Sequence, residues 1–135
     1  MTAEATTLIH QTMPLCATLG ITAERLDADE VVLTMAWAAE RCTIGDALHG
    51  GAIMALADSA GAAAAAANLP AGAIGTSTIE SKTNFVGAVT EGVAVAASRV
   101  LHAGSTTIVV ETEVRAGDRL VAKTTQTQIV LRPRS

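Results

Sequence analysis

A chain of 135 residues, half of them hydrophobic, is long enough for one domain with a continuous core, and we expect a single domain over 1–135. The formal net charge of −4 comes without clustered Lys and Arg, which argues against nucleic acid as a partner because phosphate binding needs such clusters. The first residues hold no Lys or Arg, and no apolar run reaches the roughly 18 residues of a membrane span. We therefore expect neither an export signal nor a membrane span, and a cytoplasmic location.

Two elements and a loop are predicted before residue 50. Apolar residues from Leu8 to Leu19 have mixed helical spacing, and Pro14 interrupts them, so we expect a short, broken helix. Glu30–Trp37 combines β-branched residues with partial alternation and predicts a strand. The polar stretch Glu40–Asp46 predicts a loop.

One long helix is predicted from Gly50 to Asn68. Apolar residues recur there at spacings of three and four on one face, and only glycine opposes helix formation within the range. The stretch Asn68–Gly72 holds the turn residues that commonly follow a helix. The alanines of this helix favour close packing against a sheet.

Residues rich in Val, Ile and Thr dominate the remainder and predict four strands, at Gly75–Phe85, Glu91–His102, Ser105–Arg115 and Arg119–Leu131. Short turns containing glycine separate the last three and predict hairpins. Hairpins in succession form an antiparallel sheet, and one helix can cover the apolar face of that sheet. The expected layout is therefore α+β.

The clearest chemical motif is His49-Gly50-Gly51 followed by Asp58. With this motif, and with Thr83-Asn84-Phe85 on the strand after the helix, the chain resembles the hotdog-fold acyl-CoA thioesterases of the PaaI-like group. The resemblance extends over the element order from Thr43 to Leu131. It implies a hotdog fold, in which an antiparallel sheet wraps around one central helix, and it implies a thioester hydrolase.

The start of the helix suits an anion for physical reasons. Two glycines expose backbone N–H groups without Cβ atoms in the way, and the helix dipole adds partial positive charge. The oxyanion that forms during thioester hydrolysis would be stabilised there. The resemblance implies that Gly50 donates its amide to this oxyanion and that His49 polarises or positions the thioester. A histidine before two glycines could equally be a helix cap.

Asp58 is the expected catalytic carboxylate, because an ionised carboxylate in an apolar helical run needs a partner, water or a raised pKa. It could activate water as a general base or attack the thioester directly. A helical rise of about 1.5 Å per residue separates Gly50 from Asp58 by roughly 12 Å. Two antiparallel copies would bring these residues together, so we expect a homodimer with shared active sites, and pairing of two dimers is common in such folds.

Two hydroxyl residues are further candidates for catalytic roles. Many relatives have an asparagine six residues before the histidine, where this chain has Thr43, a shorter hydrogen-bonding group. Ser77 occupies the position where relatives often hold the nucleophilic water, and Thr76 competes with it. Cys42 is a weaker candidate nucleophile, since no orienting group accompanies it. The cysteine and histidine spacings match no metal site, so no metal is expected.

Coenzyme A would be part of the substrate, and no separate cofactor is expected. Its phosphates should meet basic side chains or exposed amides. Candidate contacts are Gly51, Ser105 and Arg99, with Arg115 and Lys82 as further options. The resemblance places the nucleotide near Ser105, where many relatives have a basic residue and this chain does not.

Two other functions fit parts of the pattern. A CoA-ester hydratase of the same fold would place Gly-Asp before a histidine, which Gly45-Asp46 and His49 echo at the wrong spacing. A non-catalytic acyl-CoA-binding protein would gain nothing from an acid in an apolar cleft. The expected acyl group is aromatic or of medium chain length, with Met54, Ile79 and Phe85 as candidate lining residues.

Overall fold

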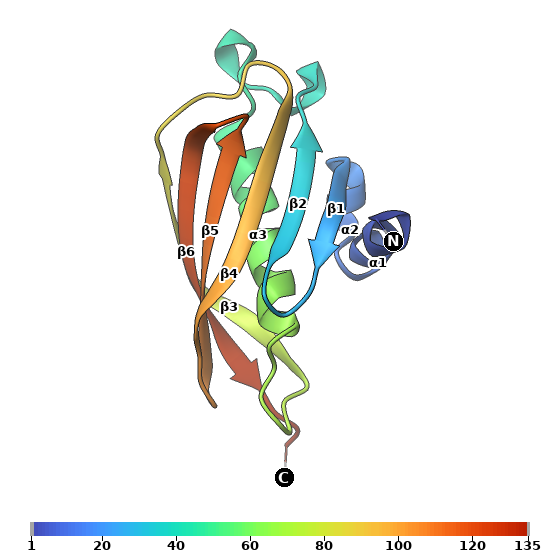
Figure 1. Cartoon of the computed structure of the whole chain (residues 1–135), viewed down its shortest axis with the longest axis vertical. Helices are drawn as coiled ribbons and strands as arrows, with labels where there is room; N and C mark the ends of the chain where they lie inside the picture. The colour runs from blue at the N-terminus through green and yellow to red at the C-terminus, as the bar shows by residue number, and fades with distance from the viewer. Residues whose placement is uncertain (1, 135) are drawn as a thin grey trace.

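One long helix and an antiparallel sheet organise the chain (Figure 1). The computed structural model describes residues 2–134. Their elements, in chain order, are α1 (Thr2–Thr12), α2 (Pro14–Thr18), β1 (Ile21–Leu26), β2 (Val31–Ala36), α3 (Gly50–Ala66), β3 (Gly75–Phe85), β4 (Val93–Ala103), β5 (Thr107–Ala116) and β6 (Arg119–Leu131). Two short 3-10 turns, Ala39–Arg41 and Ile44–Asp46, lie between β2 and α3.

The strands lie in the order β1-β2-β4-β5-β6-β3, and every neighbouring pair is antiparallel. Hairpins join β4 to β5 and β5 to β6, whereas β3 pairs with β6 at the far edge of the sheet. Figure 1 shows α3 packed behind this sheet and the two N-terminal helices beside β1. This arrangement is the hotdog fold, so the predicted fold class is confirmed.

The N-terminal region departs from the expectation in two ways. Helix α1 begins at Thr2 rather than at Leu8, and Pro14 opens α2, where a missing backbone N–H costs no helical hydrogen bond. β1 has no counterpart among the elements predicted from the sequence. Only Ile21 and Ala23 are buried in this strand, and the polar residues around them leave too weak an apolar pattern.

The long helix and the four strands after it are confirmed. α3 begins at Gly50 as predicted and ends at Ala66, two residues before Asn68. The side-chain amide of Asn68 donates to the carbonyl of Ala64 at 2.9 Å, and thus helps to end the helix. β3 and β6 have the predicted bounds, and the ends of β4 and β5 shift by at most two residues.

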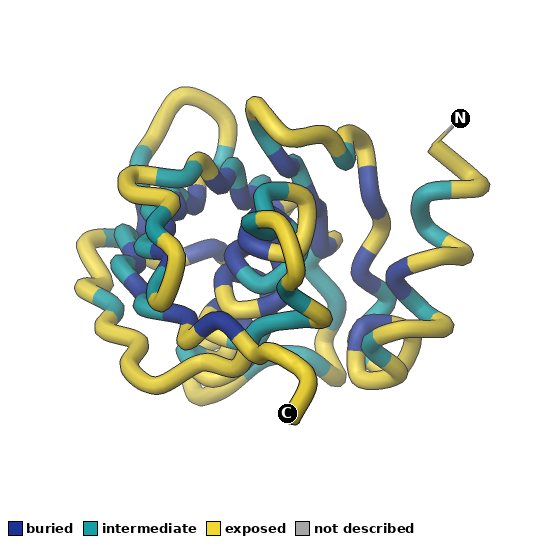
Figure 2. Tube along the Cα trace, turned by 90° about the horizontal axis from the view of Figure 1, so that it is seen from below, coloured by how far each residue is buried: buried dark blue, intermediate teal, exposed yellow. Residues whose placement is uncertain are grey.

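The core lies between α3 and the sheet (Figure 2). Alternate residues of β5 and β6 are buried, and they face Ile53, Leu56 and several alanines of α3. Because alanine is small, the helix lies close to the sheet, as close packing requires. Two long polar side chains, Gln126 and Gln128, are also buried in this layer. Among residues 2–134, no helix combines the length and the apolar character needed to span a bilayer.

Candidate active site

His49 caps the helix that carries the candidate site. Its ring Nδ1 accepts a hydrogen bond from the backbone N–H of Gly51 at 2.8 Å. A neutral imidazole that accepts at Nδ1 carries its proton on Nε2, so the second ring nitrogen is a donor. The ring is exposed to solvent. The two roles considered for His49 are therefore compatible, because one nitrogen caps the helix while the other can donate to a ligand.

Gly50 is the first residue of α3, and the first N–H groups of a helix have no acceptor within it. The neighbouring amide of Gly51 is already bonded to His49, which leaves the Gly50 amide as the candidate anion donor. A Cβ built on Gly50 would lie 3.4 Å from the ring of Phe85, at the end of β3. The aromatic ring therefore packs beside the helix start.

The loop before His49 is held by backbone contacts. Cys42 and Leu48 form an antiparallel bridge, and the N–H of Thr43 donates to the carbonyl of Ala47 at 2.8 Å. The indole N–H of Trp37 donates to the carbonyl of Asp46 at 2.7 Å. The structure thus places Thr43, exposed, in an ordered loop that leads directly into α3.

Asp58 lies two turns into α3, on the side that the sheet leaves open. Gly51, Met54 and Asp58 are exposed at spacings of three and four residues, whereas Ile53 and Leu56 are buried. The Asp58 side chain reaches solvent, yet the atoms packed around its carboxyl still remove part of its hydration. Burial therefore raises the pKa of Asp58 above its usual value.

A row of amides connects Asp58 to the sheet. Gln126 Nε2 donates to Asp58 Oδ1 at 3.4 Å. Gln128 Nε2 donates to Gln126 Oε1 at 3.0 Å and to Thr78 Oγ1 at 2.6 Å. Because Gln128 donates to the Gln126 carbonyl oxygen, the Gln126 N–H groups are turned toward the carboxylate. A chain of hydrogen bonds thus runs from β3 through β6 to α3.

Gly61 provides the space for this row of amides. A Cβ on Gly61 would lie 2.6 Å from Cδ of Gln126, closer than real contacts allow. Glycine inside a helix costs about 1 kcal/mol relative to alanine, so its presence in α3 needs a reason. The buried amide of Gln126 supplies that reason.

Gln126, Gln128 and Thr78 are not among the site residues predicted from the sequence. A usable signal was present, since the two glutamines are two residues apart in a strand whose buried residues alternate. They share their face with the buried residues Thr124 and Val130, so strand parity alone puts both amides in the core.

Ser77 and Thr76 lie on different faces of β3. Thr76 lines a pocket with residues of α3, and Thr78 bonds to the buried Gln128. Because side chains alternate along a strand, Ser77 between them faces away from α3, and it is exposed. One copy of the chain therefore brings Thr76 and Thr78, and not Ser77, to the side where α3 lies.

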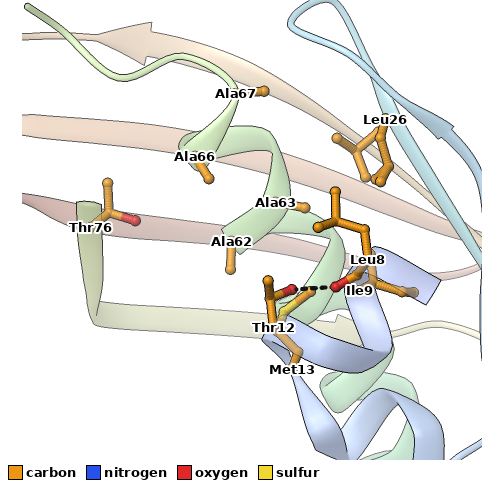
Figure 3. A pocket seen from close by; sticks show the side chains of 11 residues that line it. Leu8, Ile9, Thr12, Met13, Leu26, Ala62, Ala63, Ala66, Ala67 and Thr76 are labelled. Carbon is orange, nitrogen blue, oxygen red and sulfur yellow. Dashed lines mark hydrogen bonds between the residues drawn. The ribbon is translucent and has the colours of Figure 1, made fainter. Parts of the chain in front are cut away.

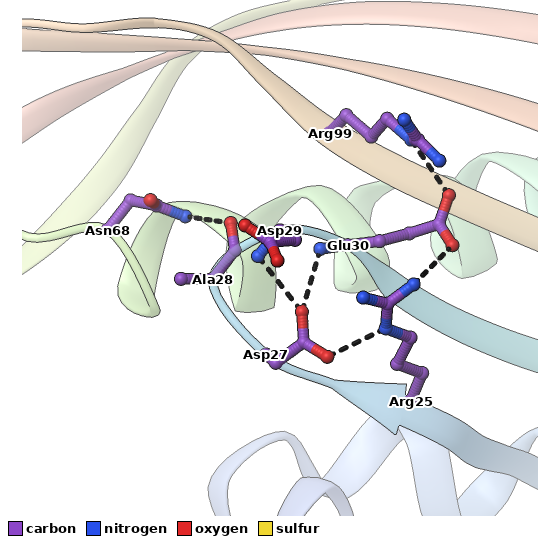
Figure 4. Close-up of polar contacts among 7 residues, drawn as sticks. All are labelled: Arg25, Asp27, Ala28, Asp29, Glu30, Asn68 and Arg99. Atoms are coloured by element: carbon purple, nitrogen blue, oxygen red, sulfur yellow. Dashed lines mark hydrogen bonds and ion pairs between the residues drawn. The ribbon is translucent and has the colours of Figure 1, made fainter.

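Arg99 lies away from the helix start. Its Nε donates to Glu30 Oε2 at 2.9 Å, and Glu30 also pairs with Arg25, which pairs with Asp27 (Figure 4). Asn68, just beyond the end of α3, lies beside this network. Within one copy, Arg99 is not brought together with His49 and Gly50, which lie at the other end of the helix.

Ser105 lies in the turn between β4 and β5, and its carbonyl accepts a hydrogen bond from Arg132 Nη2 at 2.9 Å. The guanidinium of Arg132 also donates to the carbonyl of Ala71 at 2.9 Å. The sequence around Ser105 lacks a basic residue, but the fold brings one there from beyond β6.

Thiol chemistry is disfavoured in this site. Burial raises the pKa of Cys16, and the nearby Asp58 raises it further, while a hydrogen bond with Ser59 partly opposes this. Burial also raises the pKa of Cys42. Protonated thiols are poor nucleophiles. Among residues 2–134, no three His, Cys, Asp or Glu side chains gather in a way that could hold a metal ion.

Helix α3 is unbroken from Gly50 to Asp58, so a rise of about 1.5 Å per residue holds them roughly 12 Å apart. A single carbonyl group cannot touch both residues of the same copy. The donors at Gly50 and the carboxylate of Asp58 can therefore act on the same thioester carbonyl only if they come from two copies of the chain.

Comparison with known proteins gives one family match. The model of the thioesterase superfamily matches residues 45–123, which include the helix start, Asp58 and most of the sheet. No curated protein matches the chain.

Several solved structures share the fold. A conserved protein, PA5202 of Pseudomonas aeruginosa, is 33% identical, with a TM-score of 0.81 over 87% of this chain and 93% of its own. The PaaI protein of the phenylacetic acid degradation operon of E. coli is 22% identical, with a TM-score of 0.84 over 95% and 91% of the two chains. The thioesterase HI1161 of Haemophilus influenzae is also 22% identical, with a TM-score of 0.81 over 92% and 90%.

Proposed function

Because the chain belongs to the thioesterase superfamily, we propose that it hydrolyses an acyl-CoA thioester to the free acid and CoA, at sites that two copies build together. One observation carries the proposal. A single unbroken helix, α3, presents the donors His49 and Gly50 at its start and, two turns on, a carboxylate whose pKa burial has raised. Acyl transfer needs both of these parts.

The helix start receives the thioester carbonyl. The amide of Gly50 and the Nε2–H of His49 donate to its oxygen, on which negative charge develops as the carbonyl carbon is attacked. The partial positive charge of the helix end favours the same anion. Loss of one such donor typically costs about 2.7–4 kcal/mol of transition-state stabilisation.

Asp58 of the other copy supplies the base. As the water oxygen bonds to the carbonyl carbon, its proton passes to the carboxylate; the tetrahedral intermediate then collapses, and the departing CoA sulfur takes the proton. The raised pKa of Asp58 suits this transfer, because a base whose pKa lies closer to neutral pH accepts the proton more readily. Direct attack by Asp58 through an anhydride is the second route, and trapping of an acylated Asp58 with hydroxylamine would distinguish it.

The hydroxyl groups have secondary roles in the proposal. Thr43 lies in the loop beside the helix start, where its hydroxyl can bond to the water or the thioester. Ser77, the expected partner of the water, faces away from α3 in its own copy, so Thr76 and Thr78 are better supported from the geometry.

The exposed edge strand supports a dimer. β3 is eleven residues long, lies at the edge of the sheet and is exposed along most of its length. Its outer backbone N–H and C=O groups are a template for pairing with another strand. Antiparallel pairing of two β3 strands would make one continuous sheet with both α3 helices on the same side. Each Asp58 would then approach the Gly50 of the other copy. A dimer of dimers stays a prediction.

Contacts to the CoA moiety also stay a prediction. The Gly51 amide is hydrogen-bonded to His49, and Arg99 is paired with Glu30. Either group would have to break this contact before it could bind CoA. The turn at Ser105 is better supported, because Arg132 adds a cation beside it. The cytoplasmic location expected from the sequence stays a prediction as well.

Thiol release from a panel of aryl and aliphatic acyl-CoA esters tests the proposed function. We expect the wild type to hydrolyse at least one of them and Asp58→Asn to lose roughly a thousandfold in kcat. Asparagine keeps the acceptor that Gln126 needs, and size exclusion checks that the assembly is retained. If the wild type binds the esters without releasing thiol, the hydrolase proposal fails and a non-catalytic acyl-CoA-binding protein accounts for the family match.

A further inference from the structure

A pocket lies further along the open side of α3 (Figure 3). Its volume is about 500 Å³, and its walls come from α1, the C-terminal half of α3, the β1–β2 region and the start of β3. This size falls within the range of roughly 300–1,000 Å³ that is typical of small-molecule sites.

The pocket lining is apolar and uncharged. Its eleven residues include no charged and no aromatic side chain, and their only side-chain polar groups are the hydroxyls of Thr12 and Thr76. The hydroxyl of Thr12 already donates to the carbonyl of Leu8 at 2.9 Å. Such a surface favours hydrocarbon and would leave the phosphates of CoA without partners.

The pocket and the proposed catalytic carboxylate share one side of α3. Ala62 and Ala66 line the pocket, and they follow Asp58 by four and eight residues. Residues with this spacing lie on the same face of a helix. At about 1.5 Å per residue, the lining begins roughly 6 Å from Asp58 and extends to roughly 12 Å or more along the axis. A chain that starts at a thioester near Asp58 can run directly into it.

The walls of the pocket are well defined. Three alanines of α3, together with Ala67 just after the helix, line one wall, and larger side chains at these positions would fill the space. Opposite them, α1 is fastened to β1 by a 2.7 Å contact between His10 Nε2 and the carbonyl of Ile21. The N–H of Ala23 also donates to Thr6 Oγ1 at 2.9 Å. The space is therefore built into the fold, with small residues on one side and a fixed helix on the other.

We infer that this pocket holds the acyl chain of the substrate and that the substrate is a medium-chain aliphatic acyl-CoA. The inference rests on the proposed function and adds the substrate class. With C–C bonds of about 1.5 Å, an extended chain of roughly ten carbons spans the distance from Asp58 to the end of the pocket. An aromatic acyl group would find no aromatic side chain in this lining. Met54, Ile79 and Phe85, the lining residues expected from the sequence, lie outside the pocket.

Filling the pocket tests the inference. Ala66 is exposed on α3, and leucine is a good helix former, so Ala66→Leu should fold and place a larger side chain in the pocket. We expect the ratio of kcat/KM for decanoyl-CoA to that for butanoyl-CoA to fall roughly tenfold or more, as one or two lost methylene contacts produce. Ala17→Leu is the matched control, because Ala17 is an exposed helical alanine outside the pocket. It should keep the wild-type ratio.

The experiment distinguishes a wrong assignment of the pocket from a wrong assignment of the activity. An unchanged ratio in Ala66→Leu, from a wild type that hydrolyses both esters, overturns the pocket assignment and leaves the hydrolase intact. If the wild type hydrolyses neither ester, calorimetry can instead measure the ratio of binding affinities for the non-hydrolysable thioethers decyl-CoA and butyl-CoA. A roughly tenfold fall in that ratio in Ala66→Leu supports the pocket, and an unchanged ratio overturns it.

Discussion

A carboxylate beside a packed sheet loses hydration, and Gln126 is the side chain that returns a hydrogen bond to Asp58. Two effects therefore oppose each other at this residue. Burial raises the pKa of Asp58, while an N–H donated to the ionised form lowers it. Gln126 itself is held by Gln128 and Thr78, so we treat it as a positioning residue that acts through Asp58.

The pH profile should report this balance. If Asp58 must be ionised to act as a base, kcat/KM rises with pH through its pKa, above the usual carboxyl range. Gln126→Leu removes the donor, so we expect the acidic limb of the profile to move to still higher pH. Thr127→Val, on the opposite face of β6, should leave the limb in place. A Gln126→Leu enzyme with reduced kcat and an unmoved limb would assign the amide a purely structural role.

The same raised pKa has a consequence for stability. Since the folded-state pKa of Asp58 lies above its unfolded value, the protonated carboxyl stabilises the fold below the usual carboxyl range, and this contribution is lost as pH rises through the raised pKa. Asparagine does not ionise. We expect Asp58→Asn to unfold at higher urea concentration than the wild type at neutral pH, and the two midpoints to converge at acidic pH. Equal midpoints at both pH values would contradict a desolvated carboxylate.

At the level of single elements, α3 and the strands after it are predictable because their patterns are long. The helix start at Gly50 follows from His49-Gly50-Gly51, and the four strands after the helix follow from their Val, Ile and Thr content and the glycine turns between them. β1 is not predictable in the same way, because only two of its six residues are buried.

The residues of the candidate site also differ in whether a local sequence pattern reveals them. His49, Gly50 and Asp58 are found from local spacing, whereas Gln126 lies 68 residues from Asp58 and meets it only in the folded chain. Likewise, Arg132 reaches the turn at Ser105 from 27 residues away. Long-range contacts of this kind leave no local pattern to recognise.

The start of α3 allows a test of the proposed oxyanion donor, the amide of Gly50. Gly50→Pro removes the backbone N–H at the first helical position, where proline is tolerated, and His49 already has the φ of −59° and ψ of 134° that a residue before proline adopts. We expect kcat to fall roughly a hundredfold to a thousandfold. Gly50→Ala is the matched control, since it keeps the N–H and its Cβ meets Phe85 at an ordinary 3.4 Å. Similar losses in both variants would point to crowding instead.

At the level of the whole molecule, the open edge at β3 and the roughly 12 Å between Gly50 and Asp58 lead to the same requirement for a second copy. Within a single chain, the candidate donors and the candidate base serve different places. A complete active site therefore requires two copies related by a two-fold axis.

Charge on the edge strand should break the assembly. Ile79 is 59% exposed on β3, and lysine on an edge strand opposes pairing with another strand. We expect Ile79→Lys to elute as a monomer in size exclusion and to lose thioesterase activity, with its far-ultraviolet circular dichroism retained. Leu101→Lys, at an equally exposed leucine on β4, is the control that should remain assembled and active. A monomeric and fully active Ile79→Lys protein would refute the shared site.

Mixing two inactive variants tests whether two copies of the chain build each active site. Gly50→Pro lacks the proposed oxyanion donor and Asp58→Asn lacks the proposed base, so each homodimer should be inactive. A mixed dimer would contain one site with both parts intact. Refolding the two variants together at equal concentration should therefore restore about a quarter of the wild-type thiol release, if half of the dimers are mixed and each holds one of two sites. If the mixture stays as inactive as either variant refolded alone, although mixed dimers form, two copies do not share an active site.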